Sequence, residues 1–140
     1  MPAVAEIEDA LIAEAEALGQ FFTVQSSGRK AIPESYSYPA CFIFWDNDSE
    51  VAGQSRAIDT VDFKVVVQTA NLAGESLAAQ DAYAINDALR DRIRGKTLGL
   101  ASITPFVCLS RRCTDYDDED GMIEYTHTYR TKVYQAVVTS

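Results

Sequence analysis

Apolar residues recur at helical spacing in only two segments of this chain, and this sets the order of its elements. Residues 3–18 and 75–94 carry hydrophobic side chains at steps of three and four positions, which places them on one face of a helix. Gly19 and Gly95 follow these segments, and glycine is a common helix stop. The two apolar stripes are Val4, Ile7, Leu11, Ala15 and Leu18, and Ala78, Ala82, Ile85, Leu89 and Ile93.

The other apolar runs are short or alternating, which is typical of strands. We expect strands at residues 21–26, 40–45, 58–70, 103–113 and 122–138. In the last of these, alternation should place His127 on the core face, together with Ile123, Tyr125, Tyr129 and Val133.

The intervening segments 27–39 and 46–57 are polar and rich in turn residues, so we expect loops there. The resulting order is α-β-β-β-α-β-β. It favours an α+β fold, in which an antiparallel sheet has both helices packed on one side. The whole chain, residues 1–140, is predicted to form one domain.

Charge and cysteine content narrow the class of protein. The net charge is −9, which argues against a free-standing nucleic-acid binder but does not exclude a protein past which DNA slides. Cys41, Cys108 and Cys113 form no C-x-x-C pair, so we expect reduced thiols rather than a disulfide framework or a zinc site. The N-terminus lacks the positive start of a signal peptide, and no apolar run is long enough to span a membrane.

The stretch CTDYDDEDG, residues 113–121, holds five carboxylates: Asp115, Asp117, Asp118, Glu119 and Asp120. An EF-hand calcium loop has glycine at position 6. If Gly121 takes that position, Tyr116 stands at the first ligand position and His127 at the last, and neither residue fits. Catalytic carboxylates need different environments, whereas adjacent acids on one turn share the same solvent. We therefore expect a solvated hairpin tip between the last two strands.

No other motif indicates chemistry. GKT at 95–97 lacks the glycine of a phosphate-binding loop, since Arg90 stands at that position. A lone histidine, His127, cannot build a typical metal site and is expected to be a hydrogen-bonded core residue. The sequence therefore predicts no enzymatic activity, no cofactor and no metal ion.

Two sets of residues are candidates for contacts with partners. Half of the twelve basic residues are gathered in two places, while the N-terminal helix is acidic; these six are Arg90, Arg92, Arg94, Lys96, Arg111 and Arg112. They are either a solvated helix end with strand ends, or a surface complementary to an acidic one, such as the next copy of the chain. Tyr36 and Tyr38, in the first loop, are either interface anchors or packed on the sheet.

The order of several segments resembles a known family. These are IEDALIAEAEALG, then YPACFIFW, QTANLAGE, AYAINDALRDRIRGKTLGLASITPF, and last the acidic hairpin before YTHTYRTKVY. Together they resemble the small tail-completion proteins of Mu-like contractile-tailed phages, and more widely the phage tail terminators. The resemblance covers nearly the whole chain, and its most specific part is the helix YAINDALRDRIRGKTLGL followed by a proline-containing strand.

This resemblance implies an α+β fold and a structural role without catalytic residues. Such proteins form a hexameric ring on the head-proximal end of the tail tube, stop tube polymerisation and present a surface to the neck. The implied partners are further copies of the chain, the tail tube protein, and sheath and neck proteins. DNA would pass through the lumen without specific binding. The charge of the acidic hairpin either keeps its tip solvated or repels DNA at a ring opening. The implied location is the virion tail, after assembly in the host cytoplasm, with no membrane involved.

Two alternatives remain open. One is a head–tail joining protein of the same particle. The other is a small enzyme or ligand-binding domain, which would require a deep pocket lined by polar groups with shifted pKa values. The sequence offers no candidate for such a pocket.

Overall fold

The computed structural model describes residues 4–26, 37–50, 58–70, 75–117 and 121–134. Its elements are α1 (Val4–Leu18), β1 (Thr23–Ser26), β2 (Ala40–Glu50), β3 (Ile58–Ala70), α2 (Glu75–Ile93), β4 (Val107–Asp117) and β5 (Met122–Tyr134). The predicted order α-β-β-β-α-β-β is confirmed.

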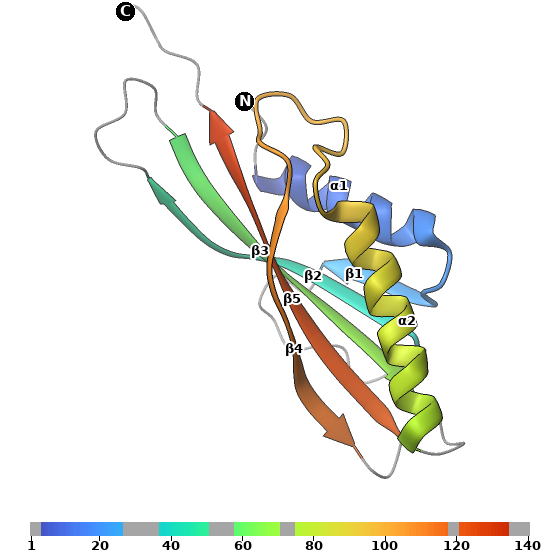
Figure 1. Cartoon of the computed structure of the whole chain (residues 1–140). Coiled ribbons are helices and arrows are strands. Elements are labelled where there is room, and N and C mark those ends of the chain that lie inside the picture. Colours follow the sequence, from blue (N-terminus) through green and yellow to red (C-terminus); the bar gives the residue numbers. More distant parts are fainter. Residues whose placement is uncertain (1–3, 27–36, 51–57, 71–74, 118–120, 135–140) are drawn as a thin grey trace, which may run out of the picture.

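The strands form one five-stranded sheet in the order β1-β2-β3-β5-β4, and both helices lie against one side of it (Figure 1). The predicted α+β class is confirmed, and one strand pair departs from the antiparallel pattern: β1 runs parallel to β2. A parallel return needs a connection of about a dozen residues or more, and residues 27–39 supply that length. The other neighbouring strands are antiparallel, and β3 pairs with β5 over its whole length.

Both helices end where the sequence indicates. Gly19 and Gly95 have positive φ angles of 72° and 78°, a backbone conformation that glycine adopts without steric cost. The backbone N–H of Gly95 also donates to the carbonyl of Phe106, at 2.8 Å, and so ties the end of α2 to the residue before β4.

The main core lies between the helices and one face of the sheet. Ile7, Leu11 and Ala15 of the α1 stripe are fully buried, and so are Leu89 and Ile93 of the α2 stripe. The sheet contributes alternate residues to this core, as the period of two predicts. These include Cys41, Ile43, Phe63, Val65, Val67 and Tyr129.

Neither of the two described helices packs on the opposite face of the sheet, here called the helix-free face, which carries cross-strand polar contacts. The guanidinium of Arg130 donates twice to Asp62, at 2.8 and 3.0 Å, and Lys64 Nζ donates to Thr128 Oγ1 at 2.8 Å. The amide nitrogen of Gln68 donates to the carboxylate of Glu124 on β5 at 2.8 Å. Asp62, Gln68 and Thr128 are largely buried by this arrangement, and cross-strand partners satisfy their polar atoms.

The bounds of three strands differ from the sequence expectation, and β1 differs only in that it begins at Thr23 instead of residue 21. The strand predicted at 40–45 continues to Glu50, so residues 46–50, expected in a loop, are strand, while 51–57 lie outside the described residues. The strand predicted at 103–113 begins at Val107 and ends at Asp117. Both extensions are polar segments held by backbone pairing with a neighbouring strand, which hydrophobic periodicity does not report.

Candidate functional site

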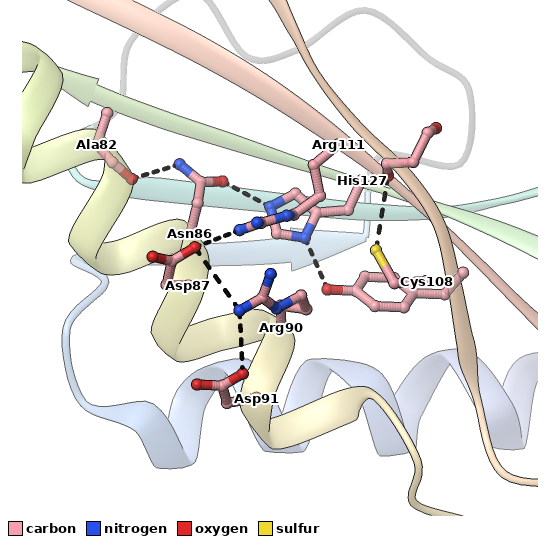
Figure 2. A network of polar contacts seen from close by, with 10 residues as sticks. Ala82, Asn86, Asp87, Arg90, Asp91, Cys108, Arg111 and His127 are labelled. Carbon is pink, nitrogen blue, oxygen red and sulfur yellow. Dashed lines mark hydrogen bonds and ion pairs between the residues drawn. The ribbon is translucent and has the colours of Figure 1, made fainter.

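His127 on β5 forms the centre of a buried polar network between the sheet and α2. Its Nε2 lies 2.6 Å from Asn86 Oδ1, and its Nδ1 lies 2.6 Å from Tyr129 Oη (Figure 2). The amide nitrogen of Asn86 donates to the carbonyl of Ala82 at 2.7 Å, which leaves its oxygen as the acceptor for the histidine. The arrangement therefore assigns the proton to Nε2, and Nδ1 accepts from the Tyr129 hydroxyl.

Burial keeps this network uncharged. The pKa of His127 is lowered to about 3, first by burial and then by the positive charges of Arg111 and Arg90. Burial also raises the pKa of Tyr129 above its usual value. The imidazole is fully buried, and both of its nitrogens are bonded within the protein, so it cannot take a proton from a substrate or bind a metal ion. The prediction of a hydrogen-bonded core histidine is confirmed.

Next to this network, Arg111 and Arg90 both lie close to the carboxylate of Asp87 on α2. Arg111 Nη1 on β4 lies 2.6 Å from Asp87 Oδ1, and Arg90 Nη2 lies 3.9 Å from the same oxygen (Figure 2). Arg90 also reaches Asp91, at 3.4 Å. The hydrogen bond from Arg111 lowers the pKa of Asp87, so this carboxylate stays ionised and is poorly suited to act as an acid or base.

A cavity of about 360 Å³ lies over these residues, lined by Tyr83, Asn86, Asp87, Arg111 and Tyr125. The rings of Tyr83 and Tyr125 meet edge to face at its wall, with centroids 6.3 Å apart. Sequence reasoning missed this cavity. Its charged groups are paired with each other and its histidine is sealed behind it, so it offers shape and hydrogen bonds rather than proton transfer.

The structure distributes the predicted interface residues over several surfaces. Arg90 and Arg111 are brought together at Asp87, whereas Arg94 is exposed just beyond the end of α2. Arg112 is exposed too. In the register of β4 against β5, Arg112 lies opposite Thr126 and Arg111 lies opposite His127. Neighbouring residues in a strand point to opposite faces, so Arg112 faces away from the helices.

Tyr38 is half-buried against a small apolar cluster on the helix-free face, formed by Ala40, Phe42 and Val66, with Phe44 beside it. This position corresponds to the packed alternative that the sequence left open for it. Tyr36 lies outside the described residues.

The acidic stretch begins inside a strand rather than at a tip. β4 and β5 are antiparallel neighbours, and their pairing continues to Asp117 opposite Met122. Asp115 and Asp117 therefore belong to β4, contrary to the expectation of a turn, while Asp118, Glu119 and Asp120 lie outside the described residues. The Asp115 carboxylate is exposed and accepts the backbone N–H of Tyr116 at 2.8 Å.

Two further properties of the described residues concern metals and membranes. Within them, no three histidine, cysteine or acidic side chains gather as metal ligands would. Neither α1 nor the described part of α2 is long and apolar enough to span a bilayer.

Comparison with known proteins gives a likeness of fold. No protein-family model matches the sequence, and no curated protein matches it. Among solved structures, a chain from the virion of a native gene transfer agent (GTA) particle matches with a TM-score of 0.59 and 18% sequence identity. The match covers 96% of this chain and 100% of the other. This chain therefore shares its fold, over nearly its whole length, with a chain of a gene transfer agent virion.

Proposed function

We propose that this protein is a structural component of a phage or phage-like particle, and that it caps the head-proximal end of the tail tube as a ring. The observation that carries the proposal is the fold match to a virion chain, which spans both chains almost completely. The family resemblance of the sequence points in the same direction. A fold by itself does not fix a function, so the surfaces of the molecule supply the remaining support.

The edges of the sheet suit assembly. β4 is the terminal strand of the sheet and is eleven residues long, and it lies beyond the strands on which the helices pack. Val107 and Leu109 expose about half of their surface along it. A long edge strand with exposed apolar residues is a ready partner for another chain. The mechanism we propose is capping by shape complementarity: a ring of copies covers the growing end of the tube and presents a new surface to the neck.

The chemistry of the candidate site agrees with a structural role. The His127 network is saturated within the protein, and the cavity above it offers no acid–base pair for catalysis, because Asp87 and Arg111 bind each other. The cavity is well placed to receive a side chain of a neighbouring protein, since its tyrosines combine an apolar ring with a hydrogen-bonding hydroxyl.

The test is to mix the purified protein with purified tail tubes and to image the tube ends by negative-stain electron microscopy. We expect rings at one end only and no further growth when tube subunits are added. Tubes that remain bare at both ends and continue to elongate, at protein concentrations far above those of the ends, would reject the proposal. A ring bound to isolated heads at the portal side, but not to tubes, would instead favour a head–tail joining protein.

A further inference from the structure

The exposed side chain of Trp45 lies in a groove that nothing in the proposed capping mechanism explains. The groove is lined by Trp45 and the next three residues of β2, and by Val4, Ala5 and Glu8 from the start of α1. Trp45 pairs with Phe63, a core residue on the helix-facing side of the sheet, so it points toward the helix layer. It nevertheless keeps 41% of its surface exposed, which is unusual for the largest apolar side chain.

A β-bulge shapes this groove. The register of β2 against β3 shifts between Trp45 and Asn47, and such irregularities turn a strand and re-aim its side chains. Asp46 and Asp48 follow immediately, and Glu8 stands on the facing helix. A groove lined by an aromatic residue and three acidic residues suits an arginine or lysine side chain, because the ring quadrupole and the negative charges both attract a cation.

The distribution of charged residues along the chain indicates a source for such a cation. Residues 4–26 and 37–49 contain seven acidic side chains and no basic one: Glu6, Glu8, Asp9, Glu14, Glu16, Asp46 and Asp48. Residues 92–114 contain five basic side chains and no acidic one: Arg92, Arg94, Lys96, Arg111 and Arg112. One chain therefore carries both a negative surface and a positive segment.

Contacts within one copy show which of these five basic residues are already paired and which are exposed. Arg92 pairs with Glu14 of α1 at 3.0 Å, and Arg111 pairs with Asp87. Arg112 lies on the helix-free face of the sheet. Arg94 is exposed in the turn after α2, and it suits a tryptophan partner because a planar guanidinium can stack on the indole face.

We propose that Arg94 of one copy docks over Trp45 of a second copy, and that the acidic groove and the basic turn after α2 form the repeating contact of the ring. This inference depends on the proposed function in one respect, because the contact it names is a contact of the proposed ring. Two unlike surfaces on one chain make a head-to-tail contact, and such contacts close into rings when the rotation allows. Lys96, exposed two residues later, adds a second positive charge beside the groove.

The experiment compares variants by ring occupancy at tube ends and by self-association in sedimentation velocity. Trp45→Ala and Asp48→Lys should each raise the concentration needed for assembly by about tenfold, a typical loss for a central contact. Phe22→Ala, which removes an aromatic ring that is 79% exposed, should leave assembly unchanged. Glu16→Lys, which reverses an exposed charge of α1 that does not line the groove, should weaken assembly less than Asp48→Lys does. Circular dichroism checks that each variant is folded, and the exposed position of Asp48 provides a second route if Trp45→Ala does not fold.

Mixing variants identifies the two partners in the contact. Arg94→Glu should assemble as poorly as Asp48→Lys, whereas an equal mixture of the two variants should recover assembly, because the lysine introduced in one variant then meets the glutamate introduced in the other. The control is an equal mixture of Asp48→Lys with Arg112→Glu, in which we expect no recovery of assembly. Recovery only when both changes lie in the same chain would show a contact within one copy and overturn the inference.

The remaining outcomes separate this inference from the capping proposal. Wild-type rings on tubes that are indifferent to Trp45→Ala and Asp48→Lys would reject the groove contact and leave capping intact. Oligomers in solution that need Trp45 and Arg94, without any binding to tubes, would support the contact and reject capping. A wild-type protein that neither self-associates nor binds tubes would overturn both.

Discussion

Asn86 on α2 and His127 on β5 meet at 2.6 Å, through Oδ1 and Nε2, in the buried layer between helix and sheet. The two residues are 41 positions apart in the sequence, so this bond joins α2 directly to the sheet. A polar contact inside an apolar layer is satisfied in one arrangement only, and this gives it a directing role that packing alone does not have.

Removing the acceptor in this bond should destabilise the protein. Asn86→Ala leaves the histidine N–H buried without a partner, and such a group costs about 1–3 kcal/mol. We expect the free energy of unfolding, measured with urea, to fall by that amount. Gln80→Ala, at an exposed position of the same helix, should change it by less than about 0.5 kcal/mol. An Asn86→Ala protein as stable as the wild type would show that water or a rotated side chain replaces the bond.

Acid should destabilise the protein through the same histidine. In the unfolded chain His127 titrates near 6.5, whereas in the folded protein burial, assisted by Arg111 and Arg90, lowers its pKa to about 3. The unfolded state therefore binds more protons between these values, so the stability falls as the pH decreases through this window. At pH 5 the loss relative to pH 8 should be about 2 kcal/mol.

The matched variant for this effect is His127→Gln, which keeps a donor and an acceptor but does not titrate. Protonation of surface carboxylates affects both proteins equally, so the difference between their pH profiles isolates the histidine. The wild type should lose stability between pH 7 and pH 5 relative to the variant. Parallel profiles would mean that His127 is protonated in the folded protein.

The three thiols should react at different rates. Cys41 is buried and burial raises its pKa, Cys108 is half-buried with its pKa also raised by burial, and Cys113 is exposed on β4. Only thiolates react with disulfide reagents, so a coloured reagent at pH 8 should label Cys113 first, Cys108 more slowly, and Cys41 only after unfolding. Cys113→Ser should remove the fast phase; a fast phase that persists would place another thiol at the surface.

Neutralising the acidic stretch should leave the fold intact. A variant with Asp115, Asp117, Asp118 and Asp120 changed to asparagine and Glu119 to glutamine loses mutual repulsion between like charges. We expect its melting temperature to be equal to or above that of the wild type. An unfolded variant would show that a contact of these carboxylates, such as the bond that Asp115 accepts from the Tyr116 N–H, is needed for the fold. If rings of this variant retain DNA and wild-type rings release it, the stretch faces the lumen.

The helices were predictable because their signals are local. The apolar stripe of α1 and the stop at Gly19 both lie within one stretch of sequence, and the bounds agree to within one residue. The outer end of β2 was not predictable in this way. Asp46 to Glu50 have no alternating apolar residues, and they are strand because they pair with residues 59–62 of β3. That pairing is a property of the sheet and leaves no trace in the segment itself.

The site was less predictable than the fold. The cavity needs Tyr83 and Asn86 from α2, Arg111 from β4 and Tyr125 from β5, and only the register of the sheet brings them together. The charge of Arg111 and Arg112 was visible in the sequence, but their separation onto opposite faces follows from the strand that holds them. By contrast, the burial of His127 was predictable, since it alternates with apolar neighbours along one strand.

The sealed histidine also affects how this protein meets its neighbours. His127 is the only histidine in the chain, and its imidazole remains neutral at every pH above about 4. No other side chain type titrates near neutrality in its unperturbed state. The surface therefore has no histidine whose charge could switch a contact near neutral pH, as happens in many pH-dependent assemblies. Salt screens contacts between exposed charges, so a particle built from this protein would loosen in concentrated salt.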